Sequence, residues 1–377
     1  MTENTLRRRT GLIACLSAFG LASALAVGTA VYADNQADAT TASSSASSSA
    51  SISASRPMPP NPYRFDTRSG SSTQTDAVAA SAEQTAGVVT IVSDLSYQGA
   101  ASAGTGIVLT SDGLILTNNH VVEGSTSIEV TDELTGTEYT ATVVGTDSTH
   151  DIAVLQLEGA SGLETANLAD TGASAGDAVT AVGNAEGTGD LVAASGTVTA
   201  LEQSITTQSE TGIEGETLEG LIQIDADIVS GDSGGPLLNA EGEVVGINTA
   251  ASSGSADITG FAIPIDDALD IVTQIEAGAD TSTIEIGYPG FLGVGIGSGT
   301  TGGAVVAGVY ENTPAAEAGL AAGDTITAVD GTPVATAAEL SANLGAREPG
   351  ETVTLEWTTA AGTAQSATVT LIAGPAA

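Results

Sequence analysis

The chain has 377 residues and a formal net charge of −39, and its seven basic residues are all arginine. Between Asp76 and Glu285 there is no Arg or Lys. Nucleic acids and anionic lipids bind through those two residue types, so the composition excludes both as partners and favours attraction of basic peptides. The same composition would also suit solubility in a salty or wall-bound environment. One cysteine, Cys15, and two histidines exclude a disulfide framework and a typical zinc site, and no cofactor is expected.

Residues 1–33 have the order of a secretory signal. Three arginines at positions 7–9 precede an apolar, uncharged stretch over residues 11–33. That stretch is also long enough to span a bilayer, so cleavage as a signal peptide and retention as a membrane anchor both stay open. Either outcome places the rest of the chain outside the cytoplasm, secreted or in the cell envelope. Residues 34–75 form an Ala/Ser/Pro-rich stretch that cannot bury enough apolar surface to fold, and we expect a disordered linker there.

Residues 76–280 show short apolar strands with turns between them, which predicts a mostly β domain, a barrel or a sandwich. Aromatic residues make up only 3% of the chain, so its core must be aliphatic. Near the end of this range, apolar residues recur at helical spacing from Ile265 to Ile275 and predict a helix. Residues 281–377 are expected to form a separate, smaller α+β domain.

The strongest local signal is Gly231-Asp232-Ser233-Gly234-Gly235-Pro236. A nucleophilic serine needs backbone N–H groups directed at a developing oxyanion, and flanking glycines permit the tight turn that this requires. A Gly-rich turn with a serine is more often only a turn, so this motif needs partners elsewhere in the chain.

Two such partners precede the serine in the order that a catalytic triad can have. His120 follows the apolar strand that ends at Thr117, and Asp151 begins the apolar run Asp151-Ile152-Ala153-Val154-Leu155. Alone, the histidine would be structural and the aspartate a turn or cap residue. Together with Ser233 they predict a nucleophile, a general base and an orienting carboxylate. His150 precedes Asp151 and would face the opposite side of a strand, so we expect it at the surface.

These motifs resemble the HtrA/Deg family of serine proteases, which have a chymotrypsin-like fold and PDZ domains. The resemblance covers residues 76–377 and includes Thr117–Val122, Asp151–Leu155, Gly231–Leu237 and Gly260–Pro264. It implies a trypsin-like protease domain of two six-stranded β-barrels over residues 76–280, with the triad between them, and a PDZ domain over residues 281–377. It also implies homotrimers packed through aromatic residues near the start of the protease domain, where this chain has few.

The resemblance also assigns binding roles. The N–H groups of Gly231 and Ser233 would form the oxyanion hole, and Thr249-Ala250-Ala251 would pair with the substrate backbone. Phe291-Leu292-Gly293-Val294 would receive a peptide C-terminus, beside a helix expected over residues 336–344. One departure concerns Asp232, because the family usually has Asn before the serine. This aspartate has no partner that the sequence identifies.

Asp227 stands six residues before the nucleophile, where trypsin-like sites have the floor of the primary specificity pocket. A carboxylate there would favour a substrate Arg or Lys, and the small residues Ala251 and Gly260 fall where the pocket walls must stay open. Asp227 could equally turn away into a loop hydrogen bond.

The predicted function is an extracytoplasmic serine endopeptidase. It would cleave unfolded or regulatory proteins, and its PDZ domain would recognise peptide C-termini. The alternative is a non-enzymatic peptide-binding or chaperone module on a protease scaffold.

Overall fold

A computed structural model describes residues 77–377 except 207–216, 252–258 and 298–301. The expected signal or anchor (residues 1–33) and linker (residues 34–75) therefore lie outside the described residues. Within the described ranges, none of the helices combines the length and the apolar character needed to cross a membrane.

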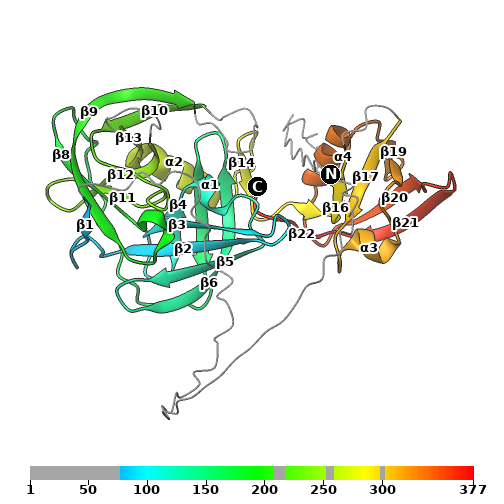
Figure 1. Cartoon of the computed structure of the whole chain (residues 1–377), viewed down its shortest axis with the longest axis horizontal. Helices are drawn as coiled ribbons and strands as arrows, with labels where there is room; N and C mark the ends of the chain where they lie inside the picture. The colour runs from blue at the N-terminus through cyan, green and yellow to red at the C-terminus, as the bar shows by residue number, and fades with distance from the viewer. Residues whose placement is uncertain (1–76, 207–216, 252–258, 298–301) are drawn as a thin grey trace, which may run out of the picture. The chain divides into compact units, whose positions relative to one another are not determined.

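The first barrel is a closed antiparallel sheet of six strands, drawn in blue to teal in Figure 1. It runs in the order β6-β5-β2-β3-β4-β7 and closes because β7 also pairs with β6. Its interior is aliphatic, as the low aromatic content requires; Ile91, Ile115 and Leu155 are fully buried. The strands are β2 (Val88–Leu95), β3 (Ala100–Val108), β4 (Leu114–Thr117), β5 (Ser127–Asp132), β6 (Thr137–Asp147) and β7 (Ile152–Leu157).

The second barrel has the same construction. Its order is β9-β10-β13-β12-β11-β8, and the pairing of β8 with β9 closes it. The short strand β1 (Val78–Ala79) adds to the edge of β9. The strands are β8 (Ala178–Gly183), β9 (Val192–Thr206), β10 (Thr217–Ile224), β11 (Pro236–Leu238), β12 (Val244–Ala251) and β13 (Gly260–Pro264). The mostly β fold and the two six-stranded barrels expected from the family resemblance are thus confirmed.

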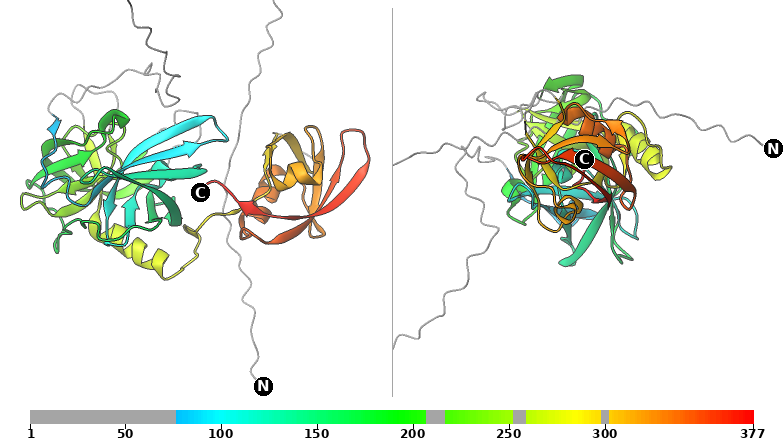
Figure 2. Two further views of the ribbon diagram at one scale, coloured as in Figure 1. Left: turned by 90° about the horizontal axis from the view of Figure 1, so that it is seen from below. Right: turned by 90° about the vertical axis from the view of Figure 1, so that its right-hand side faces the viewer.

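Helix α2 (Ile265–Glu276) confirms the helix predicted from the apolar spacing. Its buried residues are Ile265, Ala268, Ile271, Val272 and Ile275, which lie on one face. This face belongs to a single hydrophobic cluster that also contains side chains from both barrels. In the left view of Figure 2, α2 is the yellow-green helix along the lower side of the two barrels. The shared cluster holds the barrels together, which matters because each contributes different residues to the site between them. The other helical segments here are α1 (Asn119–Val122) and the 3-10 turn η1 (Ala185–Gly187).

The C-terminal domain is the expected α+β unit with its own hydrophobic core, which includes Leu292, Ile326, Leu340 and Trp357. Its main sheet runs β16-β17-β18-β20-β21, with β19 paired to β18 and a separate β15–β22 pair. Strand β16 therefore forms one edge of the sheet. The elements are β15 (Gly290–Phe291), β16 (Val294–Ile296), β17 (Ala304–Val309), α3 (Pro314–Ala318), β18 (Thr325–Val329), β19 (Thr332–Pro333), α4 (Ala337–Gly345), β20 (Thr352–Thr358), β21 (Ala364–Thr370) and β22 (Ile372–Ala373).

Helix α4 begins where the sequence predicts. The Thr336 hydroxyl accepts the backbone N–H of Glu339 at 3.2 Å, and the Glu339 carboxylate accepts the backbone N–H of Ala335 at 2.7 Å. The first bond satisfies an N–H group that the first helical turn leaves without an intrahelical partner, and the second ties the residue before the cap to the same turn.

Strand β14 (Ile284–Ile286) lies within the range expected for the second domain but pairs with β6 of the first barrel. The division at residues 280/281 stays a proposal, and this pairing puts three residues beyond it on the sheet of the first barrel.

Glu285, at the centre of β14, has an unusual protonation equilibrium. Burial raises its pKa to about 7, and the negative charge of Asp280 adds to the effect. In the unfolded chain the pKa would be near 4.5. Because the folded state binds the proton more tightly, the folded state loses stability as the pH rises from about 4.5 through 7. The full loss corresponds to roughly 3 kcal/mol at most, and partial exposure to solvent reduces it.

We expect Glu285→Gln to raise the free energy of unfolding by about 1–2 kcal/mol at pH 8 and to change it little near pH 4.5, since the amide removes the ionisation. Urea unfolding followed by circular dichroism at both pH values measures the difference. Glu276→Gln is the control, because Glu276 is an exposed carboxylate at the end of α2. An equal gain at both pH values would contradict the burial of an ionisable carboxyl.

Candidate active site

His120 and Asp151 come from the first barrel. Strand β4 is buried throughout and ends at Thr117, after which the chain turns into the short helix α1 that carries His120. The side-chain amide of Asn118 donates to the backbone carbonyl of Asp151 at 2.9 Å. Asp151 itself, just before β7, has a φ of +56°, a left-handed conformation that Asp tolerates better than most residues. The Asn118 bond holds this strained turn against the helix.

The Asp151 carboxylate collects three hydrogen-bond donors. The imidazole Nδ1 of His120 lies 3.0 Å from Oδ1 and 2.9 Å from Oδ2, and the backbone N–H of His120 donates to Oδ1 at 3.0 Å. The Thr249 hydroxyl, from the second barrel, donates to Oδ2 at 2.5 Å. The Asp151 side chain is only 3% exposed, so these bonds replace its hydration. A carboxylate at Nδ1 places the imidazole proton there and leaves Nε2 as the basic nitrogen.

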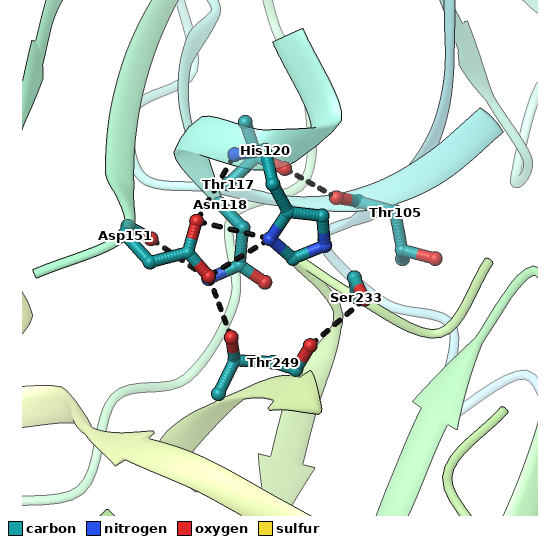
Figure 3. Close-up of polar contacts among 7 residues, drawn as sticks. All are labelled: Thr105, Thr117, Asn118, His120, Asp151, Ser233 and Thr249. Carbon is teal, nitrogen blue, oxygen red and sulfur yellow. Dashed lines mark hydrogen bonds and ion pairs between the residues drawn. The ribbon is translucent and has the colours of Figure 1, made fainter. Parts of the chain in front are cut away.

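Ser233 lies across the imidazole ring from Asp151 (Figure 3). Its hydroxyl donates to the backbone carbonyl of Thr249 at 3.1 Å. A serine hydroxyl has a single proton, so in this structure that proton is directed at Thr249. The structure thus brings together all three residues predicted as a triad, with Thr249 in contact with both Asp151 and Ser233.

The glycines around Ser233 are required by close backbone approach. A Cβ at Gly231 would lie 2.1 Å from the carbonyl oxygen of Asn184, and its φ is +96°. A Cβ at Gly234 would lie 2.1 Å from the carbonyl oxygen of Thr105, and its φ is +84°. Side chains would displace the loop at both positions. The two glycines of this motif are therefore required both by the close packing around the loop and by the positive φ angles of its turn.

Asp232, for which the sequence suggested no partner, is 2% exposed and bonds within its own loop. Its Oδ2 accepts the backbone N–H of Val229 at 2.9 Å, and its own N–H donates to the Val229 carbonyl at 3.1 Å. These reciprocal bonds close the turn that leads into Ser233.

Asp227 is half-buried, in the segment that runs from β10 toward the nucleophile. A Cβ at Gly260 would lie 2.9 Å from the carbonyl oxygen of Ala226 and 3.0 Å from the Ile228 side chain. Gly260 therefore lies directly against the residues on either side of Asp227. The backbone of Ala251 pairs with that of Gly260. Segment 252–258, which follows in the chain, lies outside the described residues.

Residues Thr249–Ala251 continue β12 beyond its pairing with β11, which ends at Ile247, while Ala250 and Ala251 remain paired with β13. This is the geometry that an added substrate strand would require.

The Phe291–Val294 segment turns tightly at Gly293, where φ is +85° and a Cβ would lie 2.2 Å from the Thr313 side chain. The carbonyl of Leu292 accepts the N–H of Ala315 at 2.9 Å, and that of Gly293 accepts the N–H of Tyr310 at 3.0 Å. Because the C=O and N–H of a trans peptide point in opposite directions, the Gly293 N–H points away from Ala315. It lies at the start of the edge strand β16.

His150 is exposed, as expected, and its Nδ1 lies 2.9 Å from the buried carboxylate of Asp147.

Sequence reasoning missed Thr105. This residue contacts the loop around the predicted nucleophile Ser233, which we call the nucleophile loop. The sequence signal for Thr105 was the glycine on each side of it, because such glycines indicate a close approach of the backbone to its neighbours. At Gly104, a Cβ would lie 2.6 Å from the side chain of Val121, on the helix of His120.

Known proteins resemble the chain in both domains. Residues 104–247 match the family model of the trypsin-like peptidase domain, and residues 290–371 match that of the PDZ domain. The periplasmic serine endoprotease DegP of Escherichia coli (strain K12) is 37% identical over 265 residues, which is 67% of this chain and 53% of DegP. The periplasmic pH-dependent serine endoprotease DegQ of the same strain is 38% identical over 266 residues, covering 67% of this chain and 55% of DegQ.

The chain spans about half the length of these curated relatives. A solved structure of the HtrA-type protease AlgW with a decapeptide is 32% identical, covers 74% of this chain and 85% of that one, and has a TM-score of 0.42. With both domains matched in this order and homologues of the DegP and DegQ type, the chain belongs to the HtrA family of serine proteases, with a trypsin-like peptidase domain followed by one PDZ domain.

Proposed function

We propose that the protein is a serine endopeptidase that cleaves polypeptides through an acyl-enzyme. The observation that carries this proposal is the contact of His120 with the buried Asp151 carboxylate, with Ser233 on the other side of the imidazole (Figure 3). A carboxylate, an imidazole and a hydroxyl in this order can activate the hydroxyl as a nucleophile.

In the proposed mechanism, His120 removes the Ser233 proton as Oγ attacks the scissile carbonyl, and later gives it to the leaving amine. Asp151 orients the imidazole and stabilises its charged form. The negative charge on the carbonyl oxygen would be stabilised by the N–H groups of Gly231 and Ser233. Loss of one such donor typically costs on the order of 10²–10³ in kcat.

For substrate recognition, we propose that Thr249, Ala250 and Ala251 pair with the substrate backbone and that Asp227 and Gly260 belong to the primary specificity pocket. Support comes from the position of Gly260, which lies directly against the residues on either side of Asp227 and so places the two in one part of the site. A half-buried carboxylate there would favour a cationic side chain. The protease domain itself contains no Arg or Lys, which would protect it from its own activity.

We also propose that Phe291, Leu292, Gly293 and Val294 bind peptide C-termini. The carbonyls of Leu292 and Gly293 bond to other parts of the domain, so the N–H groups on the opposite side of the same peptide units can receive a carboxylate. An extended peptide could also form backbone hydrogen bonds with the edge strand β16. The apolar residues Val294 and Ile296, both on this edge strand, favour an apolar last residue.

We further propose that the substrates are unfolded or regulatory proteins. The protein would meet them outside the cytoplasm, after export directed by residues 1–33. The names of the two Escherichia coli relatives place those proteins in the periplasm, which supports this location. A trimer stays a prediction from the family resemblance.

Ser233→Ala should abolish casein cleavage and fluorophosphonate labelling, because removal of a triad member costs on the order of 10⁶ in turnover. His120→Ala should do the same. His150→Ala is the matched control, since this second histidine is exposed and bonds to Asp147 instead, and it should keep parental activity. More than a few per cent of parental turnover in Ser233→Ala would contradict the assignment.

Asp227→Asn should reduce kcat/KM for an Arg peptide substrate by about 100-fold and leave that for the matched Val peptide within a few-fold, because the substrate cation loses its partner. Asp225→Asn is the control: it removes the same charge two residues away, where the carboxylate accepts the backbone N–H of Thr197. A parent enzyme that prefers Val, or an unchanged ratio in Asp227→Asn, would remove Asp227 from the pocket.

In the full-length Ser233→Ala protein, peptides with a free C-terminus and an apolar last residue should bind, and C-terminal amidation should abolish binding because it removes the carboxylate charge. Isothermal titration with matched acid and amide peptides measures this. Equal affinity for both forms would rule out carboxylate capture.

A further inference from the structure

The two proposed oxyanion donors, the N–H groups of Gly231 and Ser233, are separated by the peptide unit between Gly231 and Asp232. Three consecutive peptide units therefore decide whether both N–H groups point to one place. The carbonyl of Ser230 accepts the N–H of Glu186 at 2.7 Å, and the carbonyl of Asp232 accepts the N–H of Gly235 at 3.0 Å. Backbone groups thus hold the first and the third unit.

The carbonyl of the middle unit, Gly231 O, accepts a side chain instead. The hydroxyl of Thr105, on β3 of the first barrel, donates to it at 2.8 Å. The direction of this bond follows from proton counting. The Thr105 Oγ1 accepts the backbone N–H of Asn184 at 2.9 Å, so its single proton is directed at Gly231.

Thr105 is itself rigidly held. It is fully buried, its backbone N–H donates to the carbonyl of Ser233 at 2.9 Å, and its carbonyl accepts the hydroxyl of Thr117 at 2.7 Å (Figure 3). One residue of the first barrel thereby contacts the carbonyls of both residues whose N–H groups are proposed to bind the oxyanion. Gly231 needs such a support, because glycine resists backbone rotation less than any other residue.

We propose that Thr105 is a positioning residue for the oxyanion hole. Its hydroxyl sets the orientation of the Gly231–Asp232 peptide, and hence the convergence of the two N–H groups, without contacting substrate. The inference rests on the proposed protease function and adds a determinant of transition-state stabilisation to it.

Thr105→Val tests the proposal because it keeps the β-branched shape and replaces the hydroxyl with a methyl group, which can neither donate to Gly231 nor accept from Asn184. We expect kcat to fall about 10- to 100-fold at nearly constant KM, below the loss of a direct donor. Affinity for a peptidyl trifluoromethyl ketone, which forms a tetrahedral oxyanion on Ser233, should weaken in proportion. Affinity for the corresponding product peptide and the pH dependence of kcat/KM should stay unchanged, because His120 and Asp151 are not altered.

Thr105→Ser should restore kcat to within about threefold of the parent. Thr90→Val is the matched control: Thr90 pairs with Thr105 across β2 and β3 and is also buried, but its hydroxyl donates to Glu133. If Thr105→Val does not fold, Thr105→Ala against Thr105→Ser makes the same comparison, since the two differ by one hydroxyl group.

Parental kcat in Thr105→Val, equal weakening of the ketone and the product peptide, or equal losses in Thr90→Val would overturn the role of Thr105. A parent protein that neither turns over peptides nor reacts with fluorophosphonate would overturn the proposed protease function, and this inference with it.

Discussion

The buried carboxylate of Asp151 is the constraint on which the arrangement of the site depends. An isolated charge in this position would be costly, and hydrogen bonds must replace the water that it loses. Its donors come from both barrels: the imidazole and the backbone N–H of His120 from the first, and the hydroxyl of Thr249 from the second. The charge is fully compensated only when the barrels meet in this register. The bonds that compensate it also turn the imidazole toward Ser233.

The nucleophile loop obeys a different constraint, because its proposed work is done by backbone N–H groups. Every residue except proline has the same backbone N–H group, so the sequence can change only the direction in which this group points. Gly231 and Gly234 lie so close to neighbouring carbonyl oxygens that any side chain would displace the loop. The flexibility that glycine brings is offset by hydrogen bonds to the loop carbonyls, one of them from Thr105 on the opposite barrel. The site is therefore built at the contact between two barrels, neither of which contains it alone.

The extreme acidity of the chain bears on both proposed recognition sites, the specificity pocket and the peptide-binding segment of the PDZ domain. Arg347 is the only Arg or Lys after residue 76, and it is already paired with Asp330 at 2.9 Å and with Glu351 at 3.5 Å. Recognition of a peptide carboxylate would therefore depend on backbone N–H groups. Cationic substrates would approach in a favourable field that salt weakens, whereas acidic polypeptides would be repelled.

The sequence alone determined the fold class, the two-domain order and the three triad candidates. These depend on local patterns: apolar strands between turns, a helical repeat at residues 265–275, and a Gly-rich motif with partners in the right order. The helix expected over residues 336–344 came from the family resemblance, and the capping bonds of Thr336 and Glu339 were seen only in the structure.

Only the tertiary structure decided the contacts between distant segments. Thr105 and Gly231 lie 126 positions apart, and Thr249 and Asp151 lie 98 apart. The glycines on either side of Thr105 indicate close packing there, but the local sequence does not specify which group its hydroxyl bonds to: that of Thr105 bonds to Gly231, whereas that of Thr90 bonds to Glu133. Likewise, β14 joins the first barrel although its sequence lies next to the second domain. Local sequence limits which backbone shapes are possible, but the closure of the barrels decides which polar groups meet, because burial requires each of them to find a partner there.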